Sequence, residues 1–126
     1  MSSIALIAAA AAPTFTLPGI EFTGLAAPSR GASESSVWMV RIGPRTPGTP
    51  HRLTREEVIV AVEGRARATV GGIEYELEAG GAVIVPPRTE FALANPYAEP
   101  FCAVAVLPVG GAAMMNGETF IPPWAQ

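Results

Sequence analysis

Glycines and prolines break this chain into short apolar runs, and their spacing limits the folds open to it. The sequence holds 13 glycines and 13 prolines in 126 residues. Proline removes a backbone hydrogen bond and both residues mark turns, so long helices are disfavoured. Eight apolar runs lie between the breaks, at residues 20–25, 37–42, 58–62, 66–70, 73–77, 82–85, 91–94 and 102–107. Short strands at this spacing are typical of a β-sandwich or barrel, so we predict an all-β fold.

Length and composition indicate one packed domain over residues 1–126. Hydrophobic residues make up 49% of the chain and charged residues 15%, which favours a buried core over disorder. We expect an N-terminal arm at 1–17 and a C-terminal arm at 118–126, the latter docked by Trp124. The apolar first dozen residues lack the positive charge of a secretory signal and are too short to span a bilayer. We therefore expect a cytoplasmic protein without membrane contact.

The charged residues and the single cysteine exclude several classes of function. The net charge is −3, and the arginines are scattered rather than clustered, so we expect no nucleic-acid binding. The sequence has no lysine, which excludes a lysine Schiff base and the usual attachment of pyridoxal phosphate. Cys102 is the one cysteine, so no internal disulfide can form, and we interpret it as a small core residue.

The pattern within the runs predicts which strand faces are buried. Residues 65–70 alternate, with Ala66, Ala68 and Val70 on one face and polar side chains on the other. Residues 73–78 alternate in the same way across a Gly71-Gly72 turn. Residues 58–62 are instead apolar at every position, which predicts a strand covered on both faces. A second copy of the chain is the expected outer cover, so we predict a homodimer.

The stretch from 50 to 95 resembles the double motif of the cupin superfamily. Its first part, His-x-His then Glu then Gly, corresponds here to His51, Leu53, Glu57 and Gly64. Its second part corresponds to Gly80, Pro86, Arg88 in place of glycine, Phe91 in place of histidine, and Asn95. The chain is therefore similar to a small single-domain cupin, and this resemblance implies a double-stranded β-helix, or jelly-roll barrel.

The resemblance also implies a degenerate metal site. Cupins hold a divalent metal with the side chains at positions 51, 53, 57 and 91 of this sequence, but Leu53 and Phe91 have no donor atom. The two remaining ligands, His51 and Glu57, are fewer than the three that open catalytic metal sites keep. We expect no bound metal and no cofactor.

A carboxyl and an imidazole beside apolar side chains can instead exchange protons with a ligand. Burial raises the pKa of a carboxyl, and perturbed groups in a cavity can act as general acid and base, here Glu57 and His51. The alternative is that these two groups hydrogen-bond to each other as a vestige of the ancestral site. The candidate ligand-binding residues are Leu53, Phe91, Tyr75, Trp38, Arg41, Ala66 and Ala68.

Each of the flanking candidates has a plainer reading. The small Ala66 and Ala68 leave room for a cavity unless other side chains fill it. Tyr75 and Trp38 either line this cavity or belong to the ordinary core. Arg41 either faces inward, where it could bind an anion, or faces outward into solvent. The sequence thus predicts a small, mainly apolar organic ligand and metal-independent isomerisation, cyclisation or elimination. A non-catalytic binding or sensor protein and a metal-dependent oxygenase are the alternatives.

Overall fold

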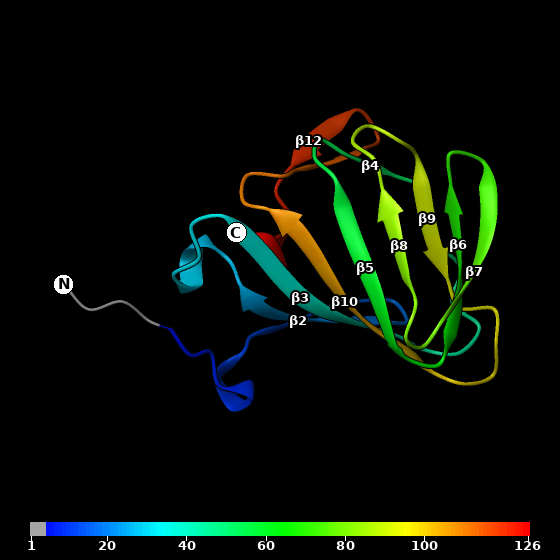
Figure 1. Ribbon diagram of the computed structural model, residues 1–126, viewed down its shortest axis with the longest axis horizontal. Helices are drawn as coiled ribbons and strands as arrows, with labels where there is room; N and C mark the ends of the chain where they lie inside the picture. The colour runs from blue at the N-terminus through cyan, green and yellow to red at the C-terminus, as the bar shows by residue number, and fades with distance from the viewer. Residues whose placement is uncertain (1–4) are drawn as a thin grey trace.

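The computed structural model describes residues 5–126, and these form an all-β domain, as predicted. Antiparallel pairing arranges the strands into three sheets (Figure 1). The large sheet has the order β1 (Thr14–Leu17), β2 (Ile20–Ala26), β3 (Ser35–Ile42), β10 (Phe101–Pro108), β5 (Glu57–Glu63) and β8 (Ala82–Val85). The second sheet is β7 (Ile73–Glu78), β6 (Arg65–Val70) and β9 (Phe91–Ala94), and the third is β12 (Glu118–Phe120), β11 (Ala113–Met115) and β4 (Arg52–Leu53).

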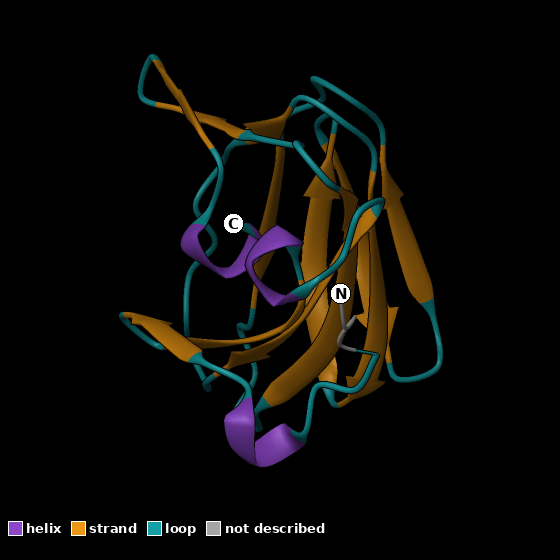
Figure 2. Cartoon of the chain, turned by 90° about the vertical axis from the view of Figure 1, so that its left-hand side faces the viewer, coloured by secondary structure: helices purple, strands orange, loops and turns teal. Residues whose placement is uncertain are grey.

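All eight predicted strands are present, within one or two residues of the predicted bounds. Three short 3₁₀ helices, η1 (Ala9–Ala11), η2 (Pro28–Arg30) and η3 (Pro123–Ala125), lie outside the strands (Figure 2). Over residues 5–126, no helix is long and apolar enough to cross a membrane.

Four short strands were not predicted. Two of them, β1 and β12, lie inside the segments expected to be arms. β12 pairs with β11 across a tight turn in which Asn116 has φ 52° and Gly117 has φ 78°. Asn-Gly is the preferred pair for a two-residue hairpin turn with positive φ at both positions, so the sequence carried a signal for this hairpin.

The core lies between the large sheet and the β7-β6-β9 sheet, which face each other in Figure 1. On the large sheet, inward side chains that lie opposite each other on neighbouring strands form rows across the sheet. The almost completely buried side chains include Phe101, Ile42, Leu107 and Val85. Burying a side chain of this size stabilises the fold by roughly 1.5–3 kcal/mol. The motif glycine Gly64 joins β5 to β6 with φ 76°, and a Cβ there would collide with the Pro100 carbonyl oxygen.

The outer face of the large sheet is partly uncovered within one chain. Along β5 the inward Glu57, Ile59 and Ala61 are buried, whereas the outward Val60 and Val62 are 37% and 53% exposed. Residues 5–126 of one chain therefore leave the outward face of this strand partly uncovered.

The C-terminal residues pack against the large sheet. Trp124 stacks on Phe22 of β2, with ring centroids 3.7 Å apart and the planes 4° from parallel. Arg30 donates a hydrogen bond from Nη2 to the Trp124 carbonyl oxygen at 3.1 Å, which ties η2 to η3. The contact of Trp124 with the sheet agrees with the docking expected of this residue.

Candidate functional site

Glu57 is a buried acid at the start of β5. Its side chain points inward, lies opposite Val85 of β8, and is 4% exposed. No hydrogen bond to its carboxyl group is formed by residues 5–126. Because burial removes the water that would stabilise the carboxylate, the pKa of Glu57 rises from 4.5 to about 8. At neutral pH this group is mainly a carboxylic acid, which can donate a proton.

His51 lies across from Phe91 at the same end of the barrel. The two residues exchange backbone hydrogen bonds of 2.9 and 2.8 Å, and their rings are 4.3 Å apart between centroids. Side chains of such a directly opposed pair lie on the same side of the sheet. Phe91 belongs to the core, so the imidazole faces the interior as well.

The hydrogen bond of the imidazole assigns its two nitrogens. Nδ1 of His51 lies 2.8 Å from the Thr49 carbonyl oxygen, which can only accept, so Nδ1 carries the hydrogen. Nε2 then holds a free lone pair. Burial lowers the pKa of His51, and the bond to Thr49 opposes this shift to a smaller extent. The neutral ring is therefore a proton acceptor at Nε2.

The structure shows no hydrogen bond between His51 and Glu57. The vestigial arrangement, in which the two groups satisfy each other, is accordingly not the one formed by residues 5–126. Burial alone accounts for the raised pKa of Glu57, without a contribution from His51. Glu57 and His51 are thus an acid and a base whose pKa values shift in opposite directions.

The other inward candidates are apolar and buried. Leu53 and Phe91 are 3% and 4% exposed and occupy two positions at which cupins carry metal ligands. Trp38, Ala66 and Ala68 are also buried. These five candidates are therefore buried, apolar side chains of the barrel interior.

Two of the candidate ligand-binding residues, Arg41 and Tyr75, are not buried in the barrel interior. Arg41 is exposed on the outer face of β3, where its Nη1 lies 3.3 Å from Cys102 Sγ, so the inward alternative is wrong. The strand alternates strictly, and inward Val40 and Ile42 put Arg41 outside. Tyr75 lies opposite Ala68 on the inward side of its sheet but is 48% exposed, because β7 is an edge strand.

Ser36 is an inward polar residue that the sequence analysis did not single out. It is 1% exposed, and its Oγ has no hydrogen-bond partner among the described residues. It occupies the same row as Leu107 of β10, two strands away from Glu57. A buried hydroxyl without a partner costs about 1–3 kcal/mol. The alternation of β3 with Trp38, Val40 and Ile42 was the available signal that this serine faces inward.

The donor atoms at the ancestral metal position do not fit a metal ion. Leu53 and Phe91 offer none, which leaves only Nε2 of His51 and the carboxyl group of Glu57 as donors. Within residues 5–126, no group of three or more His, Cys, Asp or Glu side chains is arranged to hold a metal.

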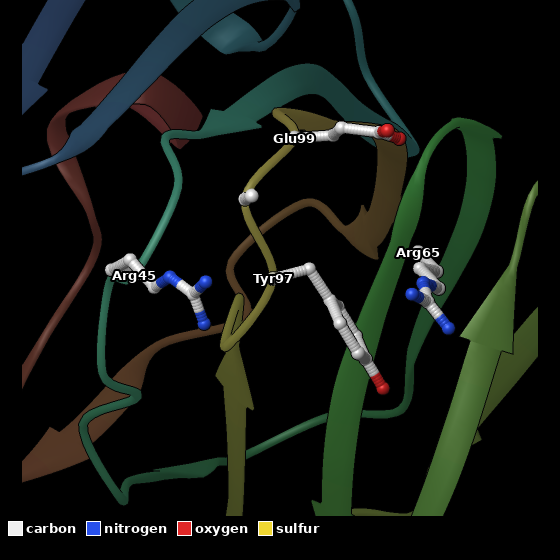
Figure 3. Close-up of a pocket in the computed structure, with 5 residues that line it drawn as sticks. Arg45, Arg65, Tyr97 and Glu99 are labelled. Atoms are coloured by element: carbon white, nitrogen blue, oxygen red, sulfur yellow. The ribbon is translucent and has the colours of Figure 1, made fainter.

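Residues 5–126 form two concavities on the outside of the barrel that are large enough to hold a small ligand, and neither is lined by Glu57 or His51. One has a volume of about 250 Å³ and is lined by Arg45, Arg65, Tyr97, Ala98 and Glu99 (Figure 3). The other has a volume of about 330 Å³ and is lined by Thr16, Leu17, Gly19, Ile20, Glu21, Arg41 and Gly43. Arg41 therefore lines a surface hollow rather than the barrel interior.

Comparisons with known proteins agree with this architecture. Residues 38–107 match the protein-family model described as Cupin domain. No curated protein matches the sequence. Among solved structures, the chain is similar to the polyketide cyclase RemF from Streptomyces resistomycificus, with 16% identity, a TM-score of 0.75, and coverage of 95% of this chain and 82% of that one.

Two further solved structures have the same fold. An RmlC-like cupin from Shewanella frigidimarina is 18% identical, with a TM-score of 0.72 over 84% of this chain and 91% of that one. KdgF from Halomonas sp. is 19% identical, with a TM-score of 0.65 over 76% of this chain and 86% of that one. At these identities the likeness shows the fold alone, and it confirms the jelly-roll barrel that the motifs predicted.

Proposed function

The chain belongs to the cupin domain family, and from that premise we propose that it is a metal-independent enzyme in which Glu57 and His51 move protons on a small, mainly apolar organic molecule. The observation that carries the proposal is the buried Glu57 carboxyl, which has no protein partner and a pKa raised to about 8. An isolated buried acid weakens the fold, and acids with strongly shifted pKa values concentrate at functional sites.

The protonation states suit an acid and a base acting on the same molecule. The Glu57 carboxyl donates its proton to a carbonyl oxygen, while Nε2 of His51 removes a proton from the neighbouring carbon. The product of this step is an enol, with Glu57 as carboxylate and His51 as imidazolium. Return of a proton from His51 to a different carbon and of the enol proton to Glu57 completes an isomerisation with no net proton change. Cyclisation and elimination use the same two transfers on other bonds.

The surroundings favour an apolar substrate. Leu53 and Phe91 offer hydrocarbon contact beside the two proton-transfer groups, and Ser36 offers an unpaired hydroxyl on the inner face of β3. His51 is partly exposed whereas Glu57 is buried, so we place the entrance at the His51 end. Apolar surroundings keep water away, which strengthens each hydrogen bond formed to the substrate.

Similar folds offer a precedent for one of the three reaction classes. RemF is described as a polyketide cyclase, and it matches nearly the whole of this chain. Cyclisation of a substrate rich in hydrocarbon is compatible with the acid, the base and the apolar lining. Ala66 and Ala68 are the smallest inward side chains of β6, and we propose that a substrate ring lies against them.

A non-catalytic binding protein is the second candidate. The packing of Leu53, Phe91 and their neighbours around Glu57 favours it, since a ligand has to displace side chains to enter. In that case the carboxylic acid of Glu57 acts as a hydrogen-bond donor to the ligand rather than as a proton source.

We further propose that the protein acts as a homodimer assembled through the outer face of the large sheet. Val60, Val62 and Ile84 are 37%, 53% and 60% exposed there, on adjacent strands β5 and β8. Large exposed apolar patches are uncommon on monomers. A second copy would bury these side chains without blocking the inward face that carries Glu57.

Replacement of Glu57 by glutamine separates the two candidates. For an enzyme, Glu57→Gln should lower turnover of a substrate by ~10²–10⁴-fold and leave its binding nearly unchanged, because the amide keeps the shape but loses the proton. Glu56→Gln is the matched control, since Glu56 is the exposed neighbour in the sequence. Full turnover in Glu57→Gln would discard the acid–base mechanism. A ligand that binds the barrel and is never converted would favour the binding protein.

A further inference from the structure

A second candidate site lies at the end of the barrel opposite Glu57. Glu57 begins β5, and the pocket of about 250 Å³ lies beyond the other end of this strand, next to the first residue of β6, Arg65. The loops before β4 and after β9 complete it with Arg45, Tyr97, Ala98 and Glu99 (Figure 3). Neither the proposed proton transfer nor the cupin motifs assign a role to this pocket.

Asn95 holds the two loops of the pocket together. Its side chain is fully buried, and its Nδ2 donates to the carbonyl oxygens of Ile42 and Glu99 at 3.1 and 2.7 Å. Its Oδ1 accepts from the Tyr97 backbone nitrogen at 3.0 Å. The backbone of Asn95 also exchanges two hydrogen bonds of 2.9 Å with Thr46. The pocket is therefore built on a rigid support, which reduces the entropy lost when a ligand binds.

Arg45 adopts a backbone conformation that favours glycine. It has φ 58° and follows Pro44 in a tight turn. A turn with proline at its second position and positive φ at its third normally carries glycine or asparagine at the third. An arginine there costs about 1–2 kcal/mol, and strain of this kind concentrates at functional sites.

The guanidinium of Arg45 is fixed but not neutralised. Nη1 donates to the Pro96 carbonyl oxygen at 2.7 Å, and the Arg45 backbone nitrogen donates to the Tyr97 carbonyl oxygen at 3.1 Å. Among the ion pairs of the described residues, none involves Arg45. Its remaining N–H groups are available to a ligand in the pocket.

Arg65 supplies a second positive charge, held by Tyr97. Its Cζ lies 3.9 Å from the centre of the Tyr97 ring, and its Nη1 lies 3.9 Å from Glu76 Oε1. The Tyr97 hydroxyl donates a hydrogen bond to the same Glu76 carboxylate. Figure 3 shows the Tyr97 ring between Arg45 and Arg65. The Tyr97 ring thus positions the Arg65 guanidinium, whereas the Pro96 carbonyl oxygen positions that of Arg45.

We propose that this pocket binds a small organic carboxylate, held by Arg45 and Arg65. Guanidinium groups match the paired oxygens of carboxylates and phosphates. Glu99 also lines the pocket, and Glu76 pairs with Arg65, so these two carboxylates offset part of the positive charge of the two arginines. A ligand with one negative charge is consequently favoured over a phosphate with two. The volume exceeds that of a bare carboxylate, and Ala98 offers contact to a short hydrocarbon chain.

The chain contains its own control for the test. Pro-Arg-Thr occurs at 44–46 and again at 87–89, and Arg88 has φ 62°, close to the value at Arg45. Arg88 is at the Glu57 end of the barrel, where its backbone nitrogen donates to Leu53. Glycine adopts positive φ without strain, so Arg45→Gly and Arg88→Gly should both fold at least as stably as the wild type.

The test is to titrate the protein with pentanoate and to follow the NMR chemical shifts of the Tyr97, Ala98 and Glu99 backbone amides. Pentanamide, which has the same shape without the charge, is the control ligand. Inorganic phosphate tests the other class of anion. Pentanoate should shift these amides, and pentanamide should not. Arg45→Gly and Arg65→Gln should each weaken pentanoate binding about tenfold or more, the loss expected for a hydrogen bond to a charged group. Arg88→Gly should leave it unchanged.

Three results would overturn the proposal. They are the absence of amide shifts with pentanoate up to its solubility limit, equal shifts with pentanamide, and unchanged affinity in a well-folded Arg45→Gly variant. Tighter binding of phosphate than of pentanoate would refute the carboxylate class. None of these measurements involves Glu57 or His51, so their outcome neither supports nor contradicts the proposed proton-transfer function.

Discussion

The pH dependence of stability tests whether Glu57 is an isolated buried acid. The unfolded chain ionises this group near 4.5, whereas the folded chain keeps its proton up to about pH 8. Because the folded-state pKa is raised, its stabilising contribution is fully present below pH 4.5 and is lost as the pH rises towards 8. At 1.36 kcal/mol per pH unit, this shift predicts a loss of roughly 5 kcal/mol in the free energy of unfolding over the window.

The comparison with Glu57→Gln isolates this contribution. Glutamine does not titrate, so the difference in unfolding free energy between the variant and the wild type should grow with pH, by about 1.4 kcal/mol per unit, and level off above the folded pKa. His51, whose pKa is lowered, acts in the opposite sense: it costs stability as the pH falls below 6.5. Its effect is common to both proteins and cancels in the difference.

Urea unfolding at several pH values between 4 and 9 measures this difference. Glu56→Gln is the control, and because Glu56 is exposed its difference from the wild type should stay nearly flat. A flat difference for Glu57→Gln would refute the reasoning, since it would mean that Glu57 ionises in the folded chain as it does in water. A difference of the opposite slope would mean that a cation stabilises the Glu57 carboxylate.

Three further predictions concern activity, metal binding and assembly. Turnover should need protonated Glu57 and neutral His51, so the rate should fall above about pH 8 and should fall again on the acid side only at a pH lower than the ordinary imidazole pKa; a flat profile would contradict these roles. The double variant His51→Ala with Glu57→Gln should lose less activity than the sum of the two single losses. Leu53→His with Phe91→His should gain Co²⁺ binding, visible in its absorption spectrum, whereas Leu53→His alone should bind weakly; no binding by a folded double variant would contradict the motif alignment. Light scattering should find a dimer, and Val60→Glu should give a folded monomer; a monomeric wild type would contradict the assembly.

Strands with a strong pattern were predictable from the sequence, and short ones were not. In β6, Ala66 and Ala68 alternate with arginines, and alternation over six residues is enough to identify a half-buried strand. β4 has two residues, Arg52 and Leu53, too few for any period to show. It exists because Leu53 pairs with Ala113, a partner 60 residues along the chain, and such long-range pairing leaves no local trace.

The candidate site was predictable where a motif places residues, and less so elsewhere. The spacing of His51, Leu53 and Glu57 carried them to the inner face through the resemblance to cupins. The orientation of Arg41 was harder to predict, because its neighbours in the sequence are apolar on both sides and do not show which face of the strand the arginine lies on. Ser36 was overlooked because serine at the start of an apolar run reads as a boundary residue, whereas in the structure it belongs to the buried face of β3.

The substitutions that dismantle the metal site also explain the acid that replaces it. A divalent cation beside Glu57 would hold its carboxylate ionised, but Leu53 and Phe91 supply no metal donors and are themselves buried and apolar. We propose that the same two side chains remove the positive charge and the water that would keep the pKa of Glu57 low. In the double variant Leu53→His with Phe91→His loaded with Zn²⁺, the loss of stability between pH 4.5 and 8 should therefore disappear. If that loss persists with the metal bound, then other parts of the core, rather than these two residues, set the protonation of Glu57.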